Sequence, residues 1–300
     1  NLPDCSFPIR YTSLTAFNAR YRQGRITATG SLVYTNVTEH VKIGDAPADF
    51  QRLAPSFTVS LQPWQEQLLF LRLMYKSTFR MPTFNDLYYY RLGNRSLRPE
   101  KANEYNMGIT WSRSFSSFLN YLSVTVDGYY NDVTDKIVAF PTTYAWKMAN
   151  YGKVHVTGMD ATLAAAASLG KNMVLVVSGG YTWQKAIDLT DATSKSYKDQ
   201  LPYTPKHSGN VSAVLEMPWV NVGYSIVGVS ERYSMSQNIP ENRIDGYMEH
   251  TASLSRNFSF RHCKLRLQAE IINMTDTQYD VIKYYPMPGR SWRLTGTIEF

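Results

Sequence analysis

The last residues of the chain alternate strictly between apolar and polar side chains. Trp292, Leu294, Gly296, Ile298 and Phe300 fall at every second position, and polar or charged residues occupy the positions between them. A period of two residues is the period of a β-strand, so 290–300 is predicted to form one strand with an apolar and a polar face. The edge strand of a soluble sandwich shows the same alternation, so this stretch alone leaves a soluble fold open.

Strand-like segments recur along the whole chain, separated by connections that alternate between short and long. About thirteen strands are predicted, at 9–22, 25–38, 52–62, 67–78, 103–115, 121–132, 153–169, 172–185, 206–217, 220–232, 247–257, 263–273 and 290–300. The long connections are 40–51, 79–102, 134–152, 186–205, 233–246 and 274–289. Short turns at one end and longer loops at the other are typical of outer-membrane barrels. The predicted fold is therefore all-β, a transmembrane antiparallel β-barrel.

The charged side chains of these segments keep to one face. In 263–273, for example, Lys264, Arg266 and Glu270 share a face that is opposite to Leu265 and Leu267. A charge in contact with lipid would cost roughly 2–4 kcal/mol at the bilayer centre, so the charged face is predicted to be the lumen. The residues expected there, paired with one another or in contact with the lumen's contents, are Arg72, Lys76, Arg266, Glu270 and Arg293.

The composition fits this fold and argues against several other classes of protein. Of the 300 residues 44% are hydrophobic, yet no apolar run approaches the roughly 18–20 residues of a membrane-spanning helix. The 22 Tyr and 6 Trp suit the two interfaces of a membrane barrel. No nucleotide-binding, hydrolase or metal-ligand motif is present, and the net charge of +7 comes without the basic runs that bind nucleic acid. Neither an enzyme nor a cofactor is predicted.

The number of strands places the predicted ends of the chain. If the short turns are periplasmic, the first and the last predicted strands both run from the outside to the periplasm. An odd number of antiparallel strands cannot close, because its two edge strands would be parallel. The chain is therefore expected to be the carboxyl-terminal part of a larger barrel. Cys5 then lies outside and Cys263 near a periplasmic turn, too far apart for a disulfide bond.

Two stretches of the longest connection carry a resemblance to a known family. Residues 79–89 read FRMPTFNDLYY and residues 93–105 read GNRSLRPEKANEY. They resemble the FRAP and NPNL boxes of TonB-dependent outer-membrane receptors, with Met81 at the Ala position of the first box. The last region, 273–281 and 285–290, also looks like that family's final loop. The aromatic terminal strand is similar to a barrel-assembly signal, which would comprise Trp292, Leu294, Ile298 and Phe300.

The resemblance implies a barrel of twenty-two strands around an amino-terminal plug, of which this chain would hold about the last thirteen strands, at 1–300. It implies uptake of a scarce, large nutrient with energy from TonB, which would act through a plug segment absent here. The implied partners are outer-membrane lipid, the rest of the barrel and plug, and the barrel-assembly machinery, and a surface lipoprotein is also compatible. Haem receptors of this type carry a His between the two boxes. Because 79–97 contains none, cobalamin is favoured, then haem or a ferric siderophore.

The predicted ligand-binding residues are aromatic and arginine side chains of the long loops, since aromatic rings give broad apolar contact and Arg gives forked donors. They are Tyr88, Tyr89, Tyr90, Arg91, Arg95, Tyr144, Trp146, Tyr197, Tyr233 and Tyr285. An interfacial aromatic belt with surface charge would explain the same residues without any ligand. Two other functions stay open at this point: a self-contained passive porin, and an outer-membrane barrel enzyme.

Overall fold

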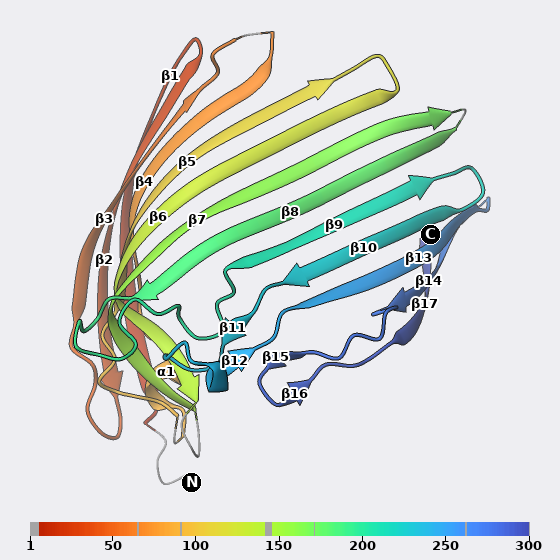
Figure 1. Cartoon of the computed structure of the whole chain (residues 1–300). Coiled ribbons are helices and arrows are strands. Elements are labelled where there is room, and N and C mark those ends of the chain that lie inside the picture. The colour runs from red at the N-terminus through yellow and green to blue at the C-terminus, as the bar shows by residue number, and fades with distance from the viewer. Residues whose placement is uncertain are drawn as a thin grey trace.

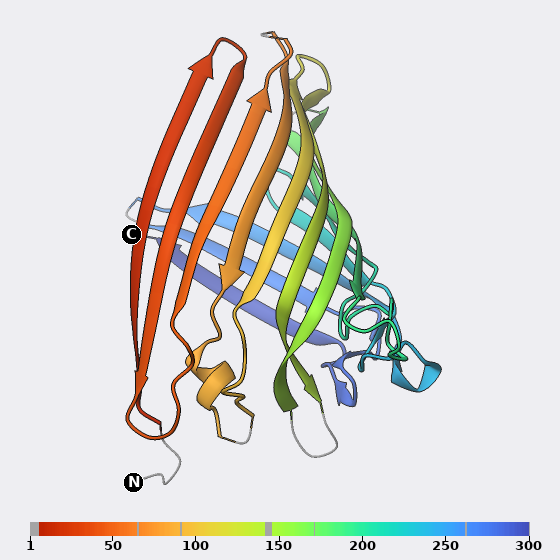
Figure 2. The same cartoon turned by 90° about the vertical axis from the view of Figure 1, so that its left-hand side faces the viewer.

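The chain forms one curved antiparallel sheet of thirteen strands. The computed structural model describes residues 6–64, 66–90, 92–141, 146–170, 172–261 and 263–299. In spatial order the strands are β1 (Pro8–Gln23), β2 (Ile26–Val41), β3 (Phe50–Leu61), β4 (Leu68–Arg80), β5 (Glu100–Ser114), β6 (Leu119–Pro141), β7 (Trp146–Gly170), β8 (Met173–Asp188), β9 (His207–Glu216), β10 (Asn221–Val229), β13 (Tyr247–Ser259), β14 (Lys264–Ile272) and β17 (Ser291–Glu299). The sheet bends into part of a barrel wall, with β1 and β17 as its two edges (Figures 1 and 2).

The predicted number of strands is confirmed, and one predicted loop is wrong. Residues 134–152 were expected to form a long connection, but β6 and β7 continue through most of that range and pair from Lys136 opposite Tyr151 to Pro141 opposite Trp146. Pro141, Asn150 and Gly152 are residue types typical of loops. Ile137 nevertheless keeps the strand alternation and is buried beneath the neighbouring loop, which favours continued pairing.

The longer connections contain short elements that alternation does not predict. These are α1 (Phe84–Tyr88), β11 (Arg232–Tyr233), the 3₁₀ turn η1 (Pro240–Asn242), β12 (Arg243–Ile244), β15 (Asp280–Ile282) and β16 (Tyr285–Pro286). All of them lie at the same end of the wall, the lower end in Figure 1. The opposite end has tight turns, such as the one at Gly24, whose φ of 53° suits glycine. Short turns at one end and elaborated loops at the other therefore occur as predicted.

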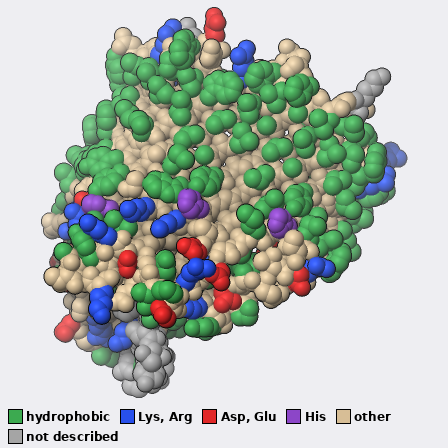
Figure 3. All heavy atoms as spheres, in the orientation of Figure 1, with side chains coloured by type: hydrophobic (Ala, Val, Ile, Leu, Met, Phe, Trp, Pro, Cys, Tyr) green, Lys and Arg blue, Asp and Glu red, His purple; other side chains and the backbone are tan. Residues whose placement is uncertain are grey.

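The apolar face of the sheet is not covered by any other part of the chain that the structure describes. Leu71 is 39% exposed, Leu267 41% and Leu294 82%, although all three lie within strands. Figure 3 shows this face as a broad field of hydrophobic side chains. Most buried hydrophobic residues instead gather near the loop end, in two small clusters around Val154 and Leu87. A soluble two-layer sandwich would bury these leucines between its sheets, so that alternative is wrong.

The charged face carries polar contacts between neighbouring strands. Arg72 donates to Thr110 Oγ1 over 2.7 Å and forms an ion pair with Asp127 over 3.0 Å. Gly108 makes room for this pair, since a Cβ there would lie 2.0 Å from Asp127 Oδ1. Three of the five residues predicted for the lumen thus take part in contacts between strands, because Arg293 also pairs with Glu270 over 3.7 Å.

The other two residues predicted for the lumen lie on the same face. Arg266 donates to Gln268 Oε1 over 3.1 Å, and Lys76 is exposed. Contact of any of the five with a plug stays a prediction. Cys263 is a free cysteine, and Cys5 lies outside the described residues. No helix in the described ranges is long and apolar enough to span a membrane.

Candidate functional site at the loop end of the wall

The loop between β4 and β5 is built around the short helix α1. Thr83 caps the helix: its hydroxyl accepts from the amide of Asp86, and the Asp86 carboxylate accepts from the amide of Thr83 over 2.8 Å. Leu87 is 2% exposed and packs with Leu97 and Ile137, which joins the loop to the outer end of β6. The first of the two boxes therefore begins as the end of β4 and continues as a helix held against the wall.

Glu39, at the outer end of β2, fastens α1 to the first two strands. It is 6% exposed and forms an ion pair with Arg10 over 2.6 Å, while Arg10 also donates to the carbonyl of Pro82 over 2.8 Å. The other carboxylate oxygen of Glu39 accepts from the Tyr88 hydroxyl over 2.5 Å. Arg95 lies over the Tyr88 ring at 5.5 Å and donates to Ser6 over 2.5 Å.

These contacts keep the Tyr88 phenol in its protonated form. Burial raises the pKa of Tyr88 first, and the hydrogen bond and negative charge of Glu39 raise it further. Binding of ferric iron by a tyrosine needs the phenolate, so this arrangement opposes such a role for Tyr88. Tyr88 and Arg95, both predicted as ligand contacts, are instead engaged within the protein.

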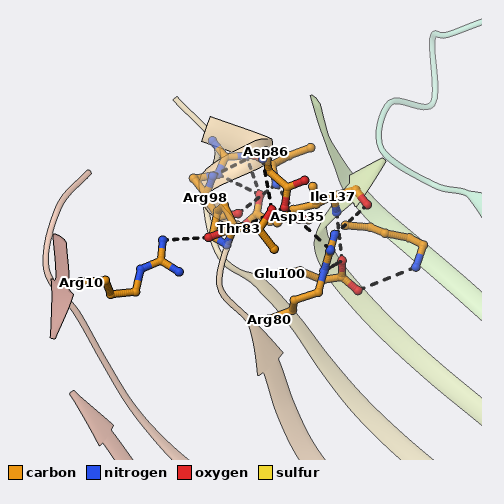
Figure 4. A network of polar contacts seen from close by, with 11 residues as sticks. Arg10, Arg80, Thr83, Asp86, Arg98, Glu100, Asp135 and Ile137 are labelled. Carbon is orange, nitrogen blue, oxygen red and sulfur yellow. Dashed lines mark hydrogen bonds and ion pairs between the residues drawn. The ribbon is translucent and has the colours of Figure 1, made fainter. Parts of the chain in front are cut away.

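The two boxes are also joined by a polar network at the outer ends of β5 and β6 (Figure 4). Arg80 lies 3.5 Å from Glu100 and donates to the carbonyl of Ile137 over 3.1 Å. Arg98 pairs with Asp135 over 2.5 Å. In the second box, Asn94 donates to the carbonyl of Met148 over 3.1 Å. The residues that carry the family resemblance therefore hold the loop in place, and a hollow of about 300 Å³ remains beside them, lined by Arg10, Phe50, Met81, Leu87, Arg95 and Leu97 among others.

Some of the aromatic residues predicted to bind a ligand lie in two neighbouring groups. Tyr89 and Tyr90 are exposed on the β4–β5 loop, at 57% and 61%. Trp146 packs against Tyr203 at 6.1 Å, and the amide of Tyr203 donates to the carbonyl of Tyr233 over 2.7 Å. A hydrogen bond from the Met148 amide to the Leu92 carbonyl brings the start of β7 to the first group.

Two further predicted residues, Tyr197 and Tyr285, are not brought into that cluster. Tyr197 lies under the ammonium group of Lys198 at 5.3 Å, and Tyr285 is exposed on β16. Arg91 and Tyr144 lie outside the described residues. We call Tyr89, Tyr90, Trp146, Tyr203 and Tyr233 the aromatic rim. Three of its rings are exposed, those of Tyr89, Tyr90 and Trp146, and their binding of a ligand stays a prediction.

Several residues that organise the loop end were not predicted. Arg232 is 4% exposed, lies over the Tyr247 ring at 5.7 Å and donates to the carbonyl of Val281 over 3.1 Å. Tyr247 stacks on Tyr279 at 3.9 Å, and Tyr279 donates to Glu249 over 2.5 Å. Burial, with Glu249 second, raises the pKa of Tyr279. The hydrogen bonds of Arg232 to Val281 and of Tyr279 to Glu249 span 49 and 30 positions, so no local sequence motif predicts them. Within the described residues no group of His, Cys, Asp or Glu side chains could hold a metal ion.

Comparison with known proteins gives a consistent family and a range of cargoes. Residues 7–274 match the family described as "TonB dependent receptor-like, beta-barrel". The chain is 25% identical over 230 residues to the vitamin B12 transporter BtuB of Photobacterium profundum, covering 74% of this chain and 34% of the relative. It is 26% identical over 231 residues to BtuB of Vibrio vulnificus, covering 74% and 33%.

Solved structures share the fold at lower identity. The unliganded ferric citrate transporter FecA superposes with a TM-score of 0.76 at 15% identity, covering 96% of this chain and 44% of that one. The copper transporter OprC gives a TM-score of 0.72 at 16% identity, covering 97% and 47%. This chain thus spans about a third of the length of the curated relatives and less than half of the solved structures.

Proposed function

The chain belongs to the TonB-dependent receptor β-barrel family of the bacterial outer membrane, and we propose that it forms part of the wall of a receptor that imports cobalamin. TonB would supply the energy. This family consists of transport receptors, so the alternative of a barrel enzyme is wrong. The observation that carries the choice of cargo is the similarity to two vitamin B12 transporters. FecA and OprC are transporters of ferric citrate and of copper, but at 15% and 16% sequence identity they support only the shared fold.

The loop residues are compatible with a corrinoid and less so with haem or ferric iron. Residues 79–97 contain no His, and burial together with the hydrogen bond to Glu39 raises the pKa of Tyr88, which keeps it a neutral phenol. The aromatic rim offers exposed rings, which give a large planar ligand broad apolar contact with little loss of side-chain entropy. Haem and ferric siderophores are the second and third candidate cargoes. A passive porin differs from all three, because its transport would not depend on TonB.

The same proposal includes further strands and a plug. In the described sheet β1 and β17 are edges with no neighbour beyond them. An unpaired backbone N–H or C=O group in hydrocarbon costs several kcal/mol, so such edges are not stable in lipid. We propose that additional strands pair with both edges to close a larger barrel. A plug within that barrel would meet Lys76, Arg266 and the Arg293–Glu270 pair on the inner face.

Titration of the purified full-length receptor tests the choice of cargo. Cyanocobalamin, haemin and a ferric siderophore are each titrated while tryptophan fluorescence and calorimetric heat are recorded. We expect a dissociation constant in the nanomolar range for cyanocobalamin alone. Tight binding of haemin or the siderophore, with no response to cyanocobalamin, would assign the receptor to another cargo. Uptake that persists without TonB would contradict active transport.

Tyr89 provides the matching test of the aromatic rim. The Tyr89→Ala variant removes an exposed ring, and loss of one stacked aromatic contact of about 1 kcal/mol corresponds to a roughly fivefold weaker affinity. We expect uptake at sub-saturating ligand to fall about fivefold, normalised to the receptor in the membrane. Tyr21→Ala, which removes an exposed ring at the opposite end of the wall, is the control. Equal uptake by both variants and the wild type would remove Tyr89 from the binding surface.

A further inference from the structure

Each histidine of the described ranges is paired with a tyrosine on the outer, apolar face of the sheet. The pairs are Tyr11–His40, Tyr130–His155, Tyr181–His207 and Tyr224–His250. All four pairs have the same register. One residue of the neighbouring strand lies directly opposite the histidine, and the tyrosine is two positions further along that strand, away from the loops. The hydroxyls of Tyr181 and Tyr224 lie 2.7 Å from the Nδ1 atoms of their histidines.

These pairs mark the level at which the membrane's outer interface meets the wall. Aromatic side chains with a polar end collect where acyl chains give way to headgroups. On the face drawn in Figure 3, the histidines follow the border between the hydrophobic field and the zone of charged side chains near the loops. Across β4 to β7 the level is filled by a continuous aromatic row, in which Tyr75, Tyr105, Tyr130 and His155 follow one another at 5.2, 6.2 and 5.3 Å.

Lysines stand on the same face just beyond this row. Lys101 of β5 and Lys153 of β7 both lie opposite Thr134 of β6, one on each side. Two strand spacings separate them by about 10 Å, and long flexible stems allow both ammonium groups to converge on one anion. Both are exposed, and neither forms an ion pair with any residue of the described ranges.

The acidic residue nearest to this pair on the outer face points to the histidine, and its buried Oδ1 has no hydrogen-bond partner in the described chain. Asp132 lies on β6 two residues before Thr134, and its Oδ1 is 3.3 Å from His155 Nε2. Glu104 and Glu39 belong to the opposite face, as the register and the Arg10–Glu39 pair show. The outer face at Thr134 therefore carries two lysines that form no ion pair within the described ranges, directly above an aromatic row, at the headgroup level.

We propose that Lys101, Thr134 and Lys153 bind a phosphate group of a phosphorylated glycolipid in the outer leaflet. The two ammonium groups neutralise the phosphate, the Thr134 hydroxyl donates a hydrogen bond, and the row from Tyr75 to His155 receives the part of the lipid between headgroup and acyl chains. The positive charge of the two lysines favours a phosphate, and their position beyond the aromatic row favours a lipid headgroup. The longer loops of outer-membrane barrels are extracellular, so this headgroup belongs to the outer leaflet. The site is independent of the transported cargo.

The test compares two double variants of the full-length receptor in a neutral detergent. Native mass spectrometry measures binding of bisphosphorylated lipid A and of the same lipid after dephosphorylation. Because a lysine near an anionic surface contributes about 1 kcal/mol, K101Q/K153Q is expected to bind the phosphorylated lipid more than about tenfold more weakly and the dephosphorylated lipid as the wild type does. The control R113Q/R256Q removes two exposed, outward-facing charges near the short-turn end.

The outcome of this comparison is decisive in either direction. A selective loss in K101Q/K153Q with wild-type affinity in the control supports the site. Equal losses in both variants would show non-specific attraction between charges. An equal loss of the dephosphorylated lipid would show contact with the acyl chains, and wild-type affinity of K101Q/K153Q for the phosphorylated lipid would place the lipid elsewhere. Each of these three results overturns the proposal, and unchanged melting temperatures confirm that both variants are folded.

Discussion

Replacing Glu39 with alanine is expected to cost about 3–5 kcal/mol of folding free energy and to release the loop around α1, because removing one partner of a buried ion pair leaves the other charge uncompensated. Arg10, whose side chain is 18% exposed, would lose its ion-pair partner. The Tyr88 hydroxyl would lose its acceptor at the same time. Hydrogen–deuterium exchange of residues 83–97 and chemical denaturation of the receptor measure the two effects.

Tyr88→Phe is the matched control for the loss of Glu39. It keeps the Arg10–Glu39 pair and removes only the hydrogen bond to a charged acceptor, for which about 1.5–3 kcal/mol is expected. Exchange in 83–97 should therefore rise less in Tyr88→Phe than in Glu39→Ala. If Glu39→Ala left exchange and stability at wild-type values, Glu39 would not be the residue that fastens the loop.

Placing arginine at Met107 is expected to destabilise the folded barrel by about 2–4 kcal/mol, the cost of a cation at the lipid-facing bilayer centre. Met107 lies in the middle of β5 and is 67% exposed on the apolar face. The neighbouring Asn106 points to the other face, so Asn106→Arg is the control and should change stability far less. Reversible urea unfolding in lipid vesicles measures both. Equal costs, or a larger cost at Asn106, would show that the faces are assigned the wrong way round.

The number of strands and their faces could be predicted because both depend on a local pattern. A period of two residues is visible within any segment, and Leu265, Leu267 and Ala269 alternate with charges whatever the rest of the chain does. The tight turns and the loop end followed from connection length. The extension of β6 and β7 was not predicted, because Asp135, Pro141 and Gly152 are residue types typical of loops. The packing of Ile137 under α1, which favours the extension, is a tertiary contact that the local sequence does not show.

The contacts that organise the candidate site depend on positions distant in the sequence. Glu39 meets Arg10 across 29 positions and Tyr88 across 49, and neither Glu39 nor Arg10 stands out in the local sequence. Tyr88 and Arg95 could be predicted as candidates from their residue types and their position in the longest loop. It could not tell that both are held within the loop, whereas Tyr89 and Tyr90 are exposed. The Tyr–His pairs are equally non-local, since each joins two strands.

The central claim is that hydrocarbon meets one face of every strand in the wall, and nitroxide labels along β5 test it most directly. The native cysteines of the full-length receptor are first replaced by serine. Single cysteines at 104–107 and 109–111 are then labelled, and each labelled receptor is placed in lipid vesicles. Gly108 is omitted because a side chain there would collide with Asp127. Collision rates with oxygen, which concentrates in the bilayer, and with a water-soluble nickel chelate are then measured. The account predicts high oxygen collision at 105, 107, 109 and 111 and low values at 104, 106 and 110. Oxygen collision that does not alternate, or that peaks at 104, 106 and 110, would contradict it.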